Sequence, residues 1–374
     1  MVKTNLKNKK VAIAMSGGVD SGVAAAILVK AGYQCAGFHM HLWSEYSKDK
    51  ILENKCCSTA SLEAARKTAH QLGMPFYIVD FSQLFKKKVV TDFLKAYGQG
   101  LTPNPCVVCN KFIKFGELFN YVRKLGFDYL ATGHYLQIVN DHSYRLFLSL
   151  DKNKDQSYFL YNLKQEQLPH ILFPVGAYQK KEVIALAKKW KLPVAERQES
   201  QEICFLAEND YRPFLKRHIP QKIKSGEVVN LEGNYLGIHQ GLPLYTIGQR
   251  HGFEIKAKEK QSMNIRKGAI PPFYVIGKNV SKNQLIVGFG QETEIKDFQV
   301  KSLNWLRSDY QKIISKHQLL VRVRHQGKLL KAKIELSGLK AKVILFEPER
   351  GIAPGQSAVF FYKNELLGGG IISG

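Results

Sequence analysis

The first half of the chain alternates short apolar runs with amphipathic segments of helical length. Residues 11–15 form an apolar run, 21–30 have helical periodicity and 34–40 form a second apolar run. The same order continues with helical segments at about 61–72, 84–97 and 111–125 and apolar runs at 76–81 and 129–132, with a Gly-, Pro- and Asn-containing loop at 98–105. Strands that alternate with helices form parallel sheets covered by helices. We therefore predict an N-terminal α/β domain with a parallel sheet.

The helical periodicity ends near Lys222. Beyond it, short alternating runs at 273–277, 285–288, 319–324 and 341–346 are separated by Gly and Pro turns. Such runs are typical of small β-barrels or sandwiches. The length of the chain fits about two or three domains. We therefore expect mainly β domains after the α/β domain.

The net charge of the chain is strongly positive, because 55 Lys and Arg residues against 31 Asp and Glu residues give +24 at pH 7. Such an excess attracts polyanions such as RNA or DNA, although a lysine-rich composition with a merely solvated surface gives the same sum. The apolar run at 11–15 is too short for a signal peptide. No stretch approaches the roughly 20 apolar residues of a membrane span. We therefore expect a cytoplasmic protein.

A glycine-rich loop follows the first predicted strand and precedes the first predicted helix. It reads Ala14, Met15, Ser16, Gly17, Gly18, Val19, Asp20, Ser21. The glycines allow an anion to approach the backbone closely, and the helix directs its free amides at the same point. The loop lacks the Gly-Lys-Thr or Gly-Lys-Ser ending of a kinase-type P-loop. It resembles instead the pyrophosphatase-type loop of enzymes that split ATP into AMP and pyrophosphate; a simple strand-to-helix turn is the alternative.

A cysteine pair lies where a loop with two prolines enters a predicted helix. Cys106 and Cys109 precede Lys111, and a helix amino terminus beside a lysine stabilises a thiolate. The same spacing fits half of a zinc site, to which the adjacent Cys56 and Cys57 would contribute only awkwardly. Nucleophile and zinc ligand both stay open from the spacing.

Cys204 lies far along the chain from that pair, between two apolar residues. A lone cysteine in such surroundings is most often buried and inert. The polar, acid-containing approach at 197–202 is unusual for a core strand, and a candidate partner thiol exists elsewhere in the chain. These two features make Cys204 a candidate reactive residue.

Six segments together resemble the bacterial-type tRNA-specific 2-thiouridylases (the MnmA family), PP-loop ATP pyrophosphatases that thiolate the wobble uridine. They are 14–21, 102–115, 131–135, 154–159, 200–205 and 245–252, in order almost from end to end. The resemblance implies a Rossmann-like, adenine nucleotide alpha hydrolase-like catalytic domain at 1–215. It also implies a small central, mainly β, tRNA-binding domain at 216–290 and a C-terminal β-barrel domain at 291–374.

The resemblance also implies the site residues. The loop Ala14 to Ser21 matches the ATP loop, and Met40 and Gly133 match further nucleotide contacts. Cys109 falls on the nucleophile, and Cys204 on the cysteine that carries a persulfide and forms a transient disulfide with Cys109. Positions that match contacts to the target base or the tRNA are Asn104, Pro105, Cys106, His134, Lys154, Asp155, Gln156, Arg322, Val323 and Gln356. No metal ligand is implied.

Two positions depart from the family pattern. Cys106 stands where other branches carry an aspartate proposed to assist acid-base chemistry, and Val323 stands where a tyrosine is usual. The first departure leaves open whether another group fills the role of the aspartate, and which of two nearby thiols reacts. The second makes half of one tRNA contact doubtful.

The implied activity is ATP-dependent 2-thiolation of the tRNA wobble uridine. The base leaves its stack, its 2-oxygen is adenylated, and persulfide sulfur replaces it with release of AMP and pyrophosphate. The implied cofactors are ATP and, with it, Mg²⁺. The implied partners are tRNAs for Lys, Glu and Gln, and a cysteine desulfurase or sulfur-relay protein as the sulfur donor.

Three other classes of protein share some of these features. An amidotransferase or ligase with the same loop would use ATP but would need neither thiol. A zinc-containing RNA-binding protein would account for the charge and the cysteines but not for the loop. A thiol-disulfide oxidoreductase would use Cys-x-x-Cys, which lies here outside a thioredoxin-like context.

Overall fold

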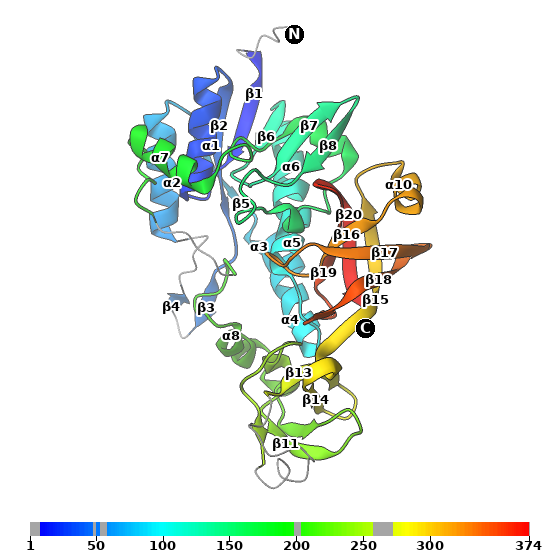
Figure 1. Cartoon of the computed structure of the whole chain (residues 1–374). Helices are drawn as coiled ribbons and strands as arrows, with labels where there is room; N and C mark the ends of the chain where they lie inside the picture. The colour runs from blue at the N-terminus through cyan, green and yellow to red at the C-terminus, as the bar shows by residue number, and fades with distance from the viewer. Residues whose placement is uncertain (1–7, 48–49, 53–57, 198–202, 257–271, 374) are drawn as a thin grey trace.

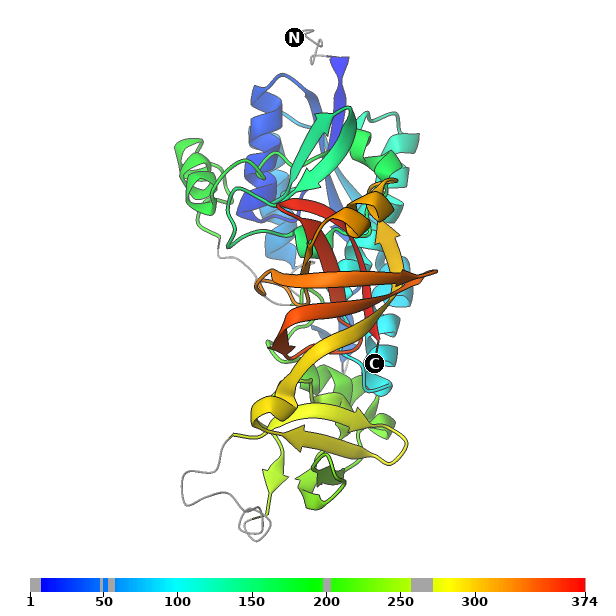
Figure 2. The same ribbon diagram turned by 45° about the vertical axis from the view of Figure 1, so that its right-hand side comes forward.

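The structure is a computed structural model and describes residues 8–47, 50–52, 58–197, 203–256 and 272–373. Its N-terminal parallel sheet and its small central sheet lie at opposite ends of an elongated molecule (Figure 1). The C-terminal barrel lies between these ends, beside a long helical stretch (Figure 2). The predicted fold class, a parallel α/β domain followed by two mainly β domains, is confirmed.

The N-terminal sheet has the strand order β5–β2–β1–β6–β9, and all its neighbouring strands pair in parallel. Its strands are β1 (Lys10–Ala14), β2 (Gln34–His41), β5 (Phe76–Asp80), β6 (Tyr129–Ala131) and β9 (Ile171–Leu172). Side chains of β1 alternate between two cores. Val11 and Ile13 pack with α1 (Val19–Lys30) and α2 (Thr59–Gln71), and Ala12 and Ala14 pack on the other side. Helices therefore cover both faces of the sheet.

Two helical stretches on that second side contain π-helical turns. The first joins α3 (Ser82–Phe85), η2 (Lys86–Val90) and α4 (Thr91–Gly98). The second joins α5 (Pro105–Cys109), η3 (Asn110–Leu118) and α6 (Phe119–Lys124), so it begins six residues before the helix predicted at 111. The prediction stopped at the Pro and Asn residues, which here start the helix rather than break it, because Pro105 occupies its first position. The cysteine pair consequently lies on the helix itself.

Six strands of the C-terminal sheet close into a barrel, since β15 pairs with both β18 and β20. They are β15 (Glu294–Trp305), β16 (Leu319–Arg322), β17 (Leu330–Ser337), β18 (Lys340–Arg350), β19 (Ser357–Tyr362) and β20 (Glu365–Ser373). A hairpin from the first half of the chain, β7 (Gln137–Asp141) and β8 (Ser143–Phe147), extends this sheet through β20. The barrel is thereby joined to the N-terminal part by main-chain hydrogen bonds.

The central sheet has the order β12–β11–β10–β14–β13, and only its β10–β14 pair is parallel. Its strands are β10 (Gly226–Val229), β11 (Tyr235–His239), β12 (Glu254–Ile255), β13 (Tyr274–Asn279) and β14 (Gln284–Gly288). The remaining elements are β3 (Glu45–Ser47), β4 (Lys50–Leu52), η4 (Ser157–Phe159), η5 (Gln165–His170), α7 (Lys180–Lys189), α8 (Tyr211–His218), η6 (Pro220–Lys222), η7 (Leu242–Leu244), η8 (Gly290–Thr293) and α10 (Tyr310–Lys316).

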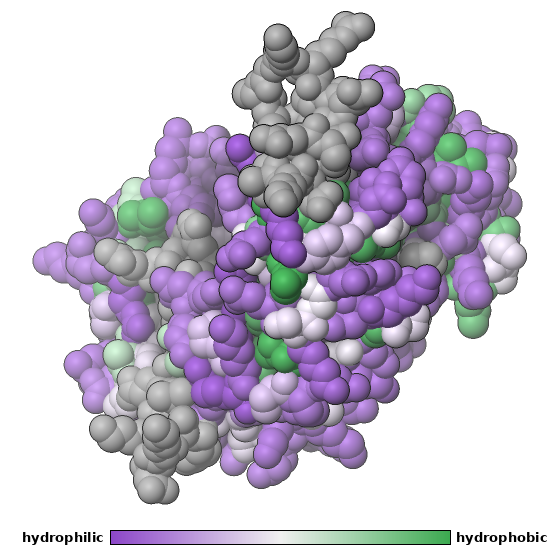
Figure 3. Space-filling view, turned by 90° about the horizontal axis from the view of Figure 1, so that it is seen from below, coloured by the Kyte–Doolittle hydropathy of each residue, from purple (hydrophilic) through white to green (hydrophobic). Residues whose placement is uncertain are grey.

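The surface seen from the end of the central domain is mainly hydrophilic, with small separate apolar patches (Figure 3). Within the described ranges, no helix combines the length and apolar character that a membrane span requires.

A cavity of about 600 Å³ lies where the three domains meet. Leu101 of the N-terminal domain, Ile247 of the central domain and Phe298 of the barrel line it together with Lys278. The Nζ of Lys278 is buried and has no hydrogen-bond partner among the described residues. Burial lowers the pKa of this ammonium from 10.5 to about 8, because a charged group is poorly solvated there.

Replacing Lys278 by Met is expected to raise the free energy of unfolding at pH 7 by about 2 kcal/mol, because it removes a buried charge. The folded-state pKa lies below the ordinary value. The wild type therefore carries the full penalty below pH 8 and loses it as pH rises from 8 towards 10.5, so the gain of the variant shrinks over that range. Denaturant unfolding at pH 7 and 9.5 measures both effects, with exposed Lys282→Met as control. A gain that is absent at pH 7, or equal at both pH values, contradicts the expectation.

Candidate active site

The glycine-rich loop lies between the end of β1 and the start of α1, as predicted. Gly17 has a φ of +77°, and a Cβ placed on it would lie 2.1 Å from the carbonyl oxygen of Ser61. Only glycine satisfies both conditions. Gly18 is the N-cap of α1, and the hydroxyl of Ser21 donates to its carbonyl over 3.0 Å. Since a glycine offers no capping side chain, the first amides of α1 are available to an anionic ligand.

Asp20 anchors the loop to two residues outside the motif. Its Oδ1 accepts a hydrogen bond from the Tyr135 hydroxyl over 2.7 Å and lies 2.7 Å from the Nζ of Lys180. Gly133 packs on the same backbone, because a Cβ there would lie 2.7 Å from the nitrogen of Ser21. Sequence reasoning placed Gly133 at the nucleotide but assigned no role to Tyr135 or Lys180. Tyr135 is the last residue of the 131–135 motif, whereas Lys180 has no sequence signal of this role.

One cavity of about 160 Å³ brings together most of the predicted chemistry. It is lined by Met15 and Ser16 of the loop, Met40 of β2, Pro105, Cys106 and Cys109 of α5, and Cys204. The segments that carry these residues are far apart in the sequence and meet at the carboxyl ends of the parallel strands, where ligands bind in open α/β sheets. Ser200, Gln201 and Glu202, which belong to the segment 200–205 together with Cys204, lie outside the described residues.

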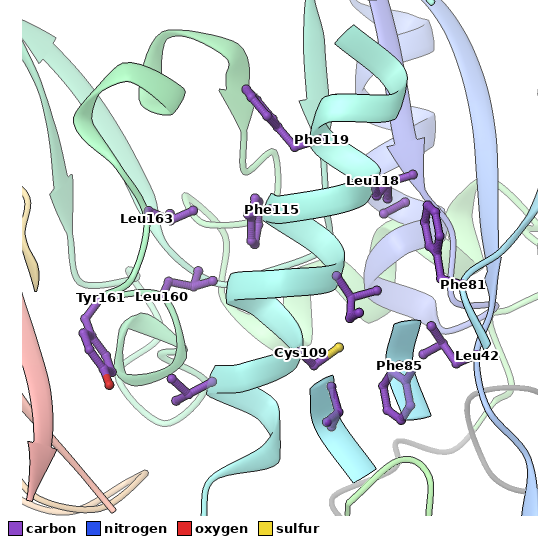
Figure 4. Close-up of a cluster of buried hydrophobic side chains, with 14 of the residues drawn as sticks. Leu42, Phe81, Phe85, Cys109, Phe115, Leu118, Phe119, Leu160, Tyr161 and Leu163 are labelled. Atoms are coloured by element: carbon purple, nitrogen blue, oxygen red, sulfur yellow. The ribbon is translucent and has the colours of Figure 1, made fainter. Parts of the chain in front are cut away.

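The cysteines of this cavity differ in their surroundings. Cys109 is buried, and Figure 4 shows its sulfur directed toward Phe85 and Leu42. Burial raises the pKa of the Cys106 thiol to about 12, and the nearby Cys204 thiol adds to this effect. For Cys106, burial thus outweighs the helix terminus that would by itself stabilise a thiolate. None of Cys106, Cys109 and Cys204 forms a disulfide in this structure.

Asn104 and Pro105 form the start of α5. The side-chain oxygen of Asn104 accepts a hydrogen bond from the amide of Val107 over 3.2 Å, and Pro105 follows as the first helical residue. An Asn N-cap followed by Pro is a strong helix start. Both residues, predicted to contact the target base, therefore also fix where the helix with Cys106 and Cys109 begins.

His134 is buried in apolar surroundings. Its Nδ1 lies 2.7 Å from the hydroxyl oxygen of Thr132, and its ring packs near Phe115 and Phe173. Burial lowers the pKa of His134 well below 6.5, and the positive charge of Lys114 acts in the same direction. The imidazole is therefore neutral at pH 7.

Several positions predicted to contact tRNA have protein partners in this structure. The carboxylate of Asp155 is buried and accepts a hydrogen bond of 2.6 Å from Arg322 of the barrel. The side chain of Gln156 accepts a hydrogen bond from the amide of Tyr135 over 3.0 Å. Val323 belongs to the barrel core, and Lys154 lies half-buried in a turn. Their contacts with tRNA remain predictions.

Gln356 also has protein partners, since its amide group donates to the carbonyls of Thr102 and Pro103. Its contact with tRNA likewise remains a prediction. Within the part of the chain that the structure covers, no three His, Cys, Asp or Glu side chains lie close enough to hold a metal ion. Cys56 and Cys57, considered for a zinc site, lie outside that part.

Sequence models of three protein domains match consecutive parts of the chain. They are the tRNA methyl transferase HUP domain at 9–208, the tRNA methyl transferase PRC-barrel domain at 212–289 and the aminomethyltransferase β-barrel domain at 295–372. Together they follow the order of the three sheets.

Relatives named tRNA-specific 2-thiouridylase MnmA match nearly the whole chain. The protein of Carboxydothermus hydrogenoformans is 41% identical over 371 residues, which cover 97% of each chain. That of Acetivibrio thermocellus is 39% identical over 372 residues, covering 98% of this chain and 100% of the relative. That of Chloroflexus aurantiacus is 41% identical over 366 residues, covering 97% and 98%.

Solved structures resemble the chain only distantly. A 4-thiouridine synthetase–RNA complex with bound ATP is 13% identical with a TM-score of 0.34, covering 57% of this chain and 51% of that chain. An NMN synthetase from Francisella tularensis is 16% identical with a TM-score of 0.33, covering 52% and 67%. At such TM-scores no conclusion rests on either likeness.

Proposed function

The chain belongs to the tRNA-specific 2-thiouridylase family, and we propose that it forms 2-thiouridine in tRNA by adenylating the base and transferring persulfide sulfur. It is thus a tRNA sulfurtransferase that uses ATP. The observation that carries the proposal is the single cavity that joins Met15 and Ser16 of the ATP loop to Cys109 and Cys204. A shared cavity allows the phosphate chemistry and the sulfur chemistry to act on one base. The domain division at 1–215, 216–290 and 291–374 is part of this proposal.

ATP binds with its phosphates at the loop of residues 14–21 and the start of α1. The positive φ of Gly17 and the uncapped first amides of α1 support this placement. Met40 and Gly133 flank the loop and complete the nucleotide site. Mg²⁺ would accompany ATP and would neutralise charge on its phosphates; Asp20, whose Oδ1 contacts Tyr135 and Lys180, is the acidic residue of the loop beside them.

The reaction has two parts. First, the 2-oxygen of the base attacks the α-phosphorus of ATP, which forms an adenylated base and releases pyrophosphate. Second, the terminal sulfur of a Cys204 persulfide attacks carbon 2, and AMP leaves with the former base oxygen. Cys109 then attacks the inner sulfur of this adduct, so that 2-thiouridine leaves and a Cys109–Cys204 disulfide forms. A dithiol reductant restores both thiols, and a persulfide donor reloads Cys204.

The target is the wobble uridine, which enters the cavity unstacked because its carbon 2 is inaccessible within a stack. Asn104, Pro105 and Cys106 meet the base there. The net charge of +24 supports tRNA binding. The substrates are tRNAs for Lys, Glu and Gln, and a cysteine desulfurase or a sulfur-relay protein supplies the persulfide in the cytoplasm.

The fate of the base oxygen tests the adenylation step. With tRNA transcribed from uridine triphosphate labelled with ¹⁸O at the 2-position, we expect one labelled oxygen in AMP for each 2-thiouridine formed. Mass spectrometry of the released nucleotides measures this ratio. Unlabelled tRNA run in ¹⁸O water is the control and should give unlabelled AMP. Release of ADP with label in inorganic phosphate would mean that the base is phosphorylated instead, and the adenylation step would be wrong.

A further inference from the structure

Partly buried hydrogen bonds tie a turn of the barrel to the loop that precedes α5. The Nε2 of Gln356 donates to the carbonyl oxygens of Thr102 and Pro103, each over 3.1 Å. The amide of Thr102 donates to the carbonyl of Pro354 over 2.9 Å. Gly355 lies so close that a Cβ on it would be 2.8 Å from the Thr102 oxygen. The barrel thus holds the chain just before the base-contact segment and the cysteine pair.

Tyr158 occupies the centre of this cluster. Its side chain is fully buried, and its hydroxyl lies 3.2 Å from the Oε1 of Gln356 and 3.1 Å from the carbonyl oxygen of Ser357. The same hydroxyl accepts a hydrogen bond from the amide of Ser357 over 3.2 Å. The side chain of Asn104 lies near the same hydroxyl and lowers its pKa, although burial raises the pKa of Tyr158 overall. One phenol oxygen therefore contacts the barrel and its turn, and it lies near the N-cap of α5.

Because the Tyr158 hydroxyl lies near the N-cap of α5, it affects the positions of the cysteine thiols on that helix. Asn104 fixes the first turn of α5 through the amide of Val107, and Cys106 and Cys109 follow within that turn and the next. Cys109 is buried against Phe85 and Leu42, so a small shift of the helix start moves its sulfur within a packed cavity. A sulfur transfer requires reacting atoms to be placed to within a fraction of an ångström.

We propose that Tyr158 is a positioning residue for sulfur transfer, whose hydroxyl holds the barrel turn at Gln356 in register with the loop that carries Cys106 and Cys109. This role rests on the proposed thiolation and deepens it. The barrel is then more than a surface for tRNA. Its position sets the geometry of the thiols.

Tyr161 provides a matched control. It lies three residues from Tyr158, is equally buried, and its hydroxyl is 3.2 Å from the hydroxyl oxygen of Ser357. Figure 4 shows it on the side of the helix that faces the barrel strands. Tyr158→Phe and Tyr161→Phe each remove one buried hydroxyl that contacts Ser357, but only the first removes the contact with Gln356.

The test compares both variants with wild type in ATP- and persulfide-dependent thiolation of unmodified tRNA. For Tyr158→Phe we expect kcat to fall about tenfold, which corresponds to about 1.4 kcal/mol, while the KM for tRNA stays within about twofold. We expect amide hydrogen exchange over residues 101–109 to rise about tenfold as well. Tyr161→Phe should leave the kcat and the exchange of this segment unchanged.

Gln356→Leu keeps the Tyr158 contacts with Ser357 and removes the side-chain hydrogen bonds of Gln356 to Thr102 and Pro103, so exchange over 101–109 should rise in this variant too. It decides the matter if Tyr158→Phe does not fold. Equal effects of the two tyrosine variants, or unchanged loop exchange in both Tyr158→Phe and Gln356→Leu, would overturn the proposal. If the wild type forms no 2-thiouridine, the proposed function fails, whereas the exchange arm still decides whether Tyr158 positions the loop.

Discussion

Thiolation by the Cys204→Ser protein is expected to fall by at least about a thousandfold when sulfur is delivered through a persulfide donor, because the chain then lacks the group that carries the sulfur. Cys109→Ser should fall similarly, because it lacks the thiol that releases sulfur from Cys204, and the protonated Cys106 thiol is a poor substitute. Both residues line the cavity that also contains the ATP loop. Retarded migration of thiolated tRNA in mercury-containing gels measures the product.

Two comparisons separate chemistry from folding in this test. Millimolar sulfide can attack the adenylated base directly, so it should restore product formation in Cys204→Ser in an ATP-dependent manner. Cys35→Ser, in which the replaced thiol lies on β2 outside the cavity, should behave as wild type. Normal persulfide-dependent activity in either Cys204→Ser or Cys109→Ser would refute the two-cysteine mechanism.

Loss of the Cys106 thiol should reduce thiolation activity far less than loss of the Cys109 thiol. Burial raises the pKa of its thiol to about 12, so it is protonated at pH 7 and is a poor nucleophile. Within the same series we expect Cys106→Ser to retain activity within about tenfold of wild type. A loss of the size expected for acid-base catalysis, on the order of a hundredfold or more, would show that the thiol has taken over the role of the family aspartate.

Gly17→Ala is expected to lower the free energy of unfolding by about 3 kcal/mol, because an alanine is strained at a φ of +77° and its Cβ would overlap the Ser61 carbonyl. For a domain of this size the midpoint of thermal unfolding should fall by about 10 °C. If the loop instead moves away from Ser61 to accommodate the methyl group, the affinity for ATP should fall at least about tenfold, since the amides no longer converge on the phosphates.

The neighbouring glycine supplies the control for that experiment. Gly18 has a φ of −92°, and a Cβ on it would come no closer than 3.6 Å to the Ser16 hydroxyl oxygen. Gly18→Ala should therefore retain the thermal stability of the wild type. Equal unfolding midpoints and equal ATP affinities for Gly17→Ala and wild type would show that the loop does not need its left-handed residue.

Local patterns in the sequence predicted the N-terminal fold well. The apolar runs at 11–15, 34–40 and 76–81 are all strands of the parallel sheet. The central strands β1 and β2 are apolar because both of their faces are covered, whereas the edge strand β5 leaves Tyr77 and Ile78 half-exposed. Pairing between distant segments was not predictable. Leu146 pairs with Leu366, and nothing in either local pattern specifies the other. Closure of the barrel by the β15–β20 pair was unpredictable for the same reason, because it too depends on pairing between distant segments.

Parts of the candidate site could be predicted where the residues of one short motif determine the local backbone conformation. The loop at 14–21 needs glycine for steric reasons. Cys204 was predicted as a reactive residue because the segment before it, 197–202, is polar and acidic. Tyr158 and Lys180 were not assigned, because each acts through a partner more than a hundred residues away in the sequence. Asp155 and Arg322 were assigned separately to tRNA, and only the fold shows that they form a buried ion pair.

The hairpin β7–β8 has a consequence for biosynthesis. Its sheet partner β20 leaves the ribosome more than two hundred residues after β8, which takes roughly 10–40 s at about 5–20 residues per second. During this interval β8 presents a free edge that can pair with other nascent chains. A message truncated before codon 365 would therefore yield a product whose intact N-terminal half still carries an unsatisfied edge. β20 therefore does two things at once, since it closes the barrel against β15 and covers the edge of β8.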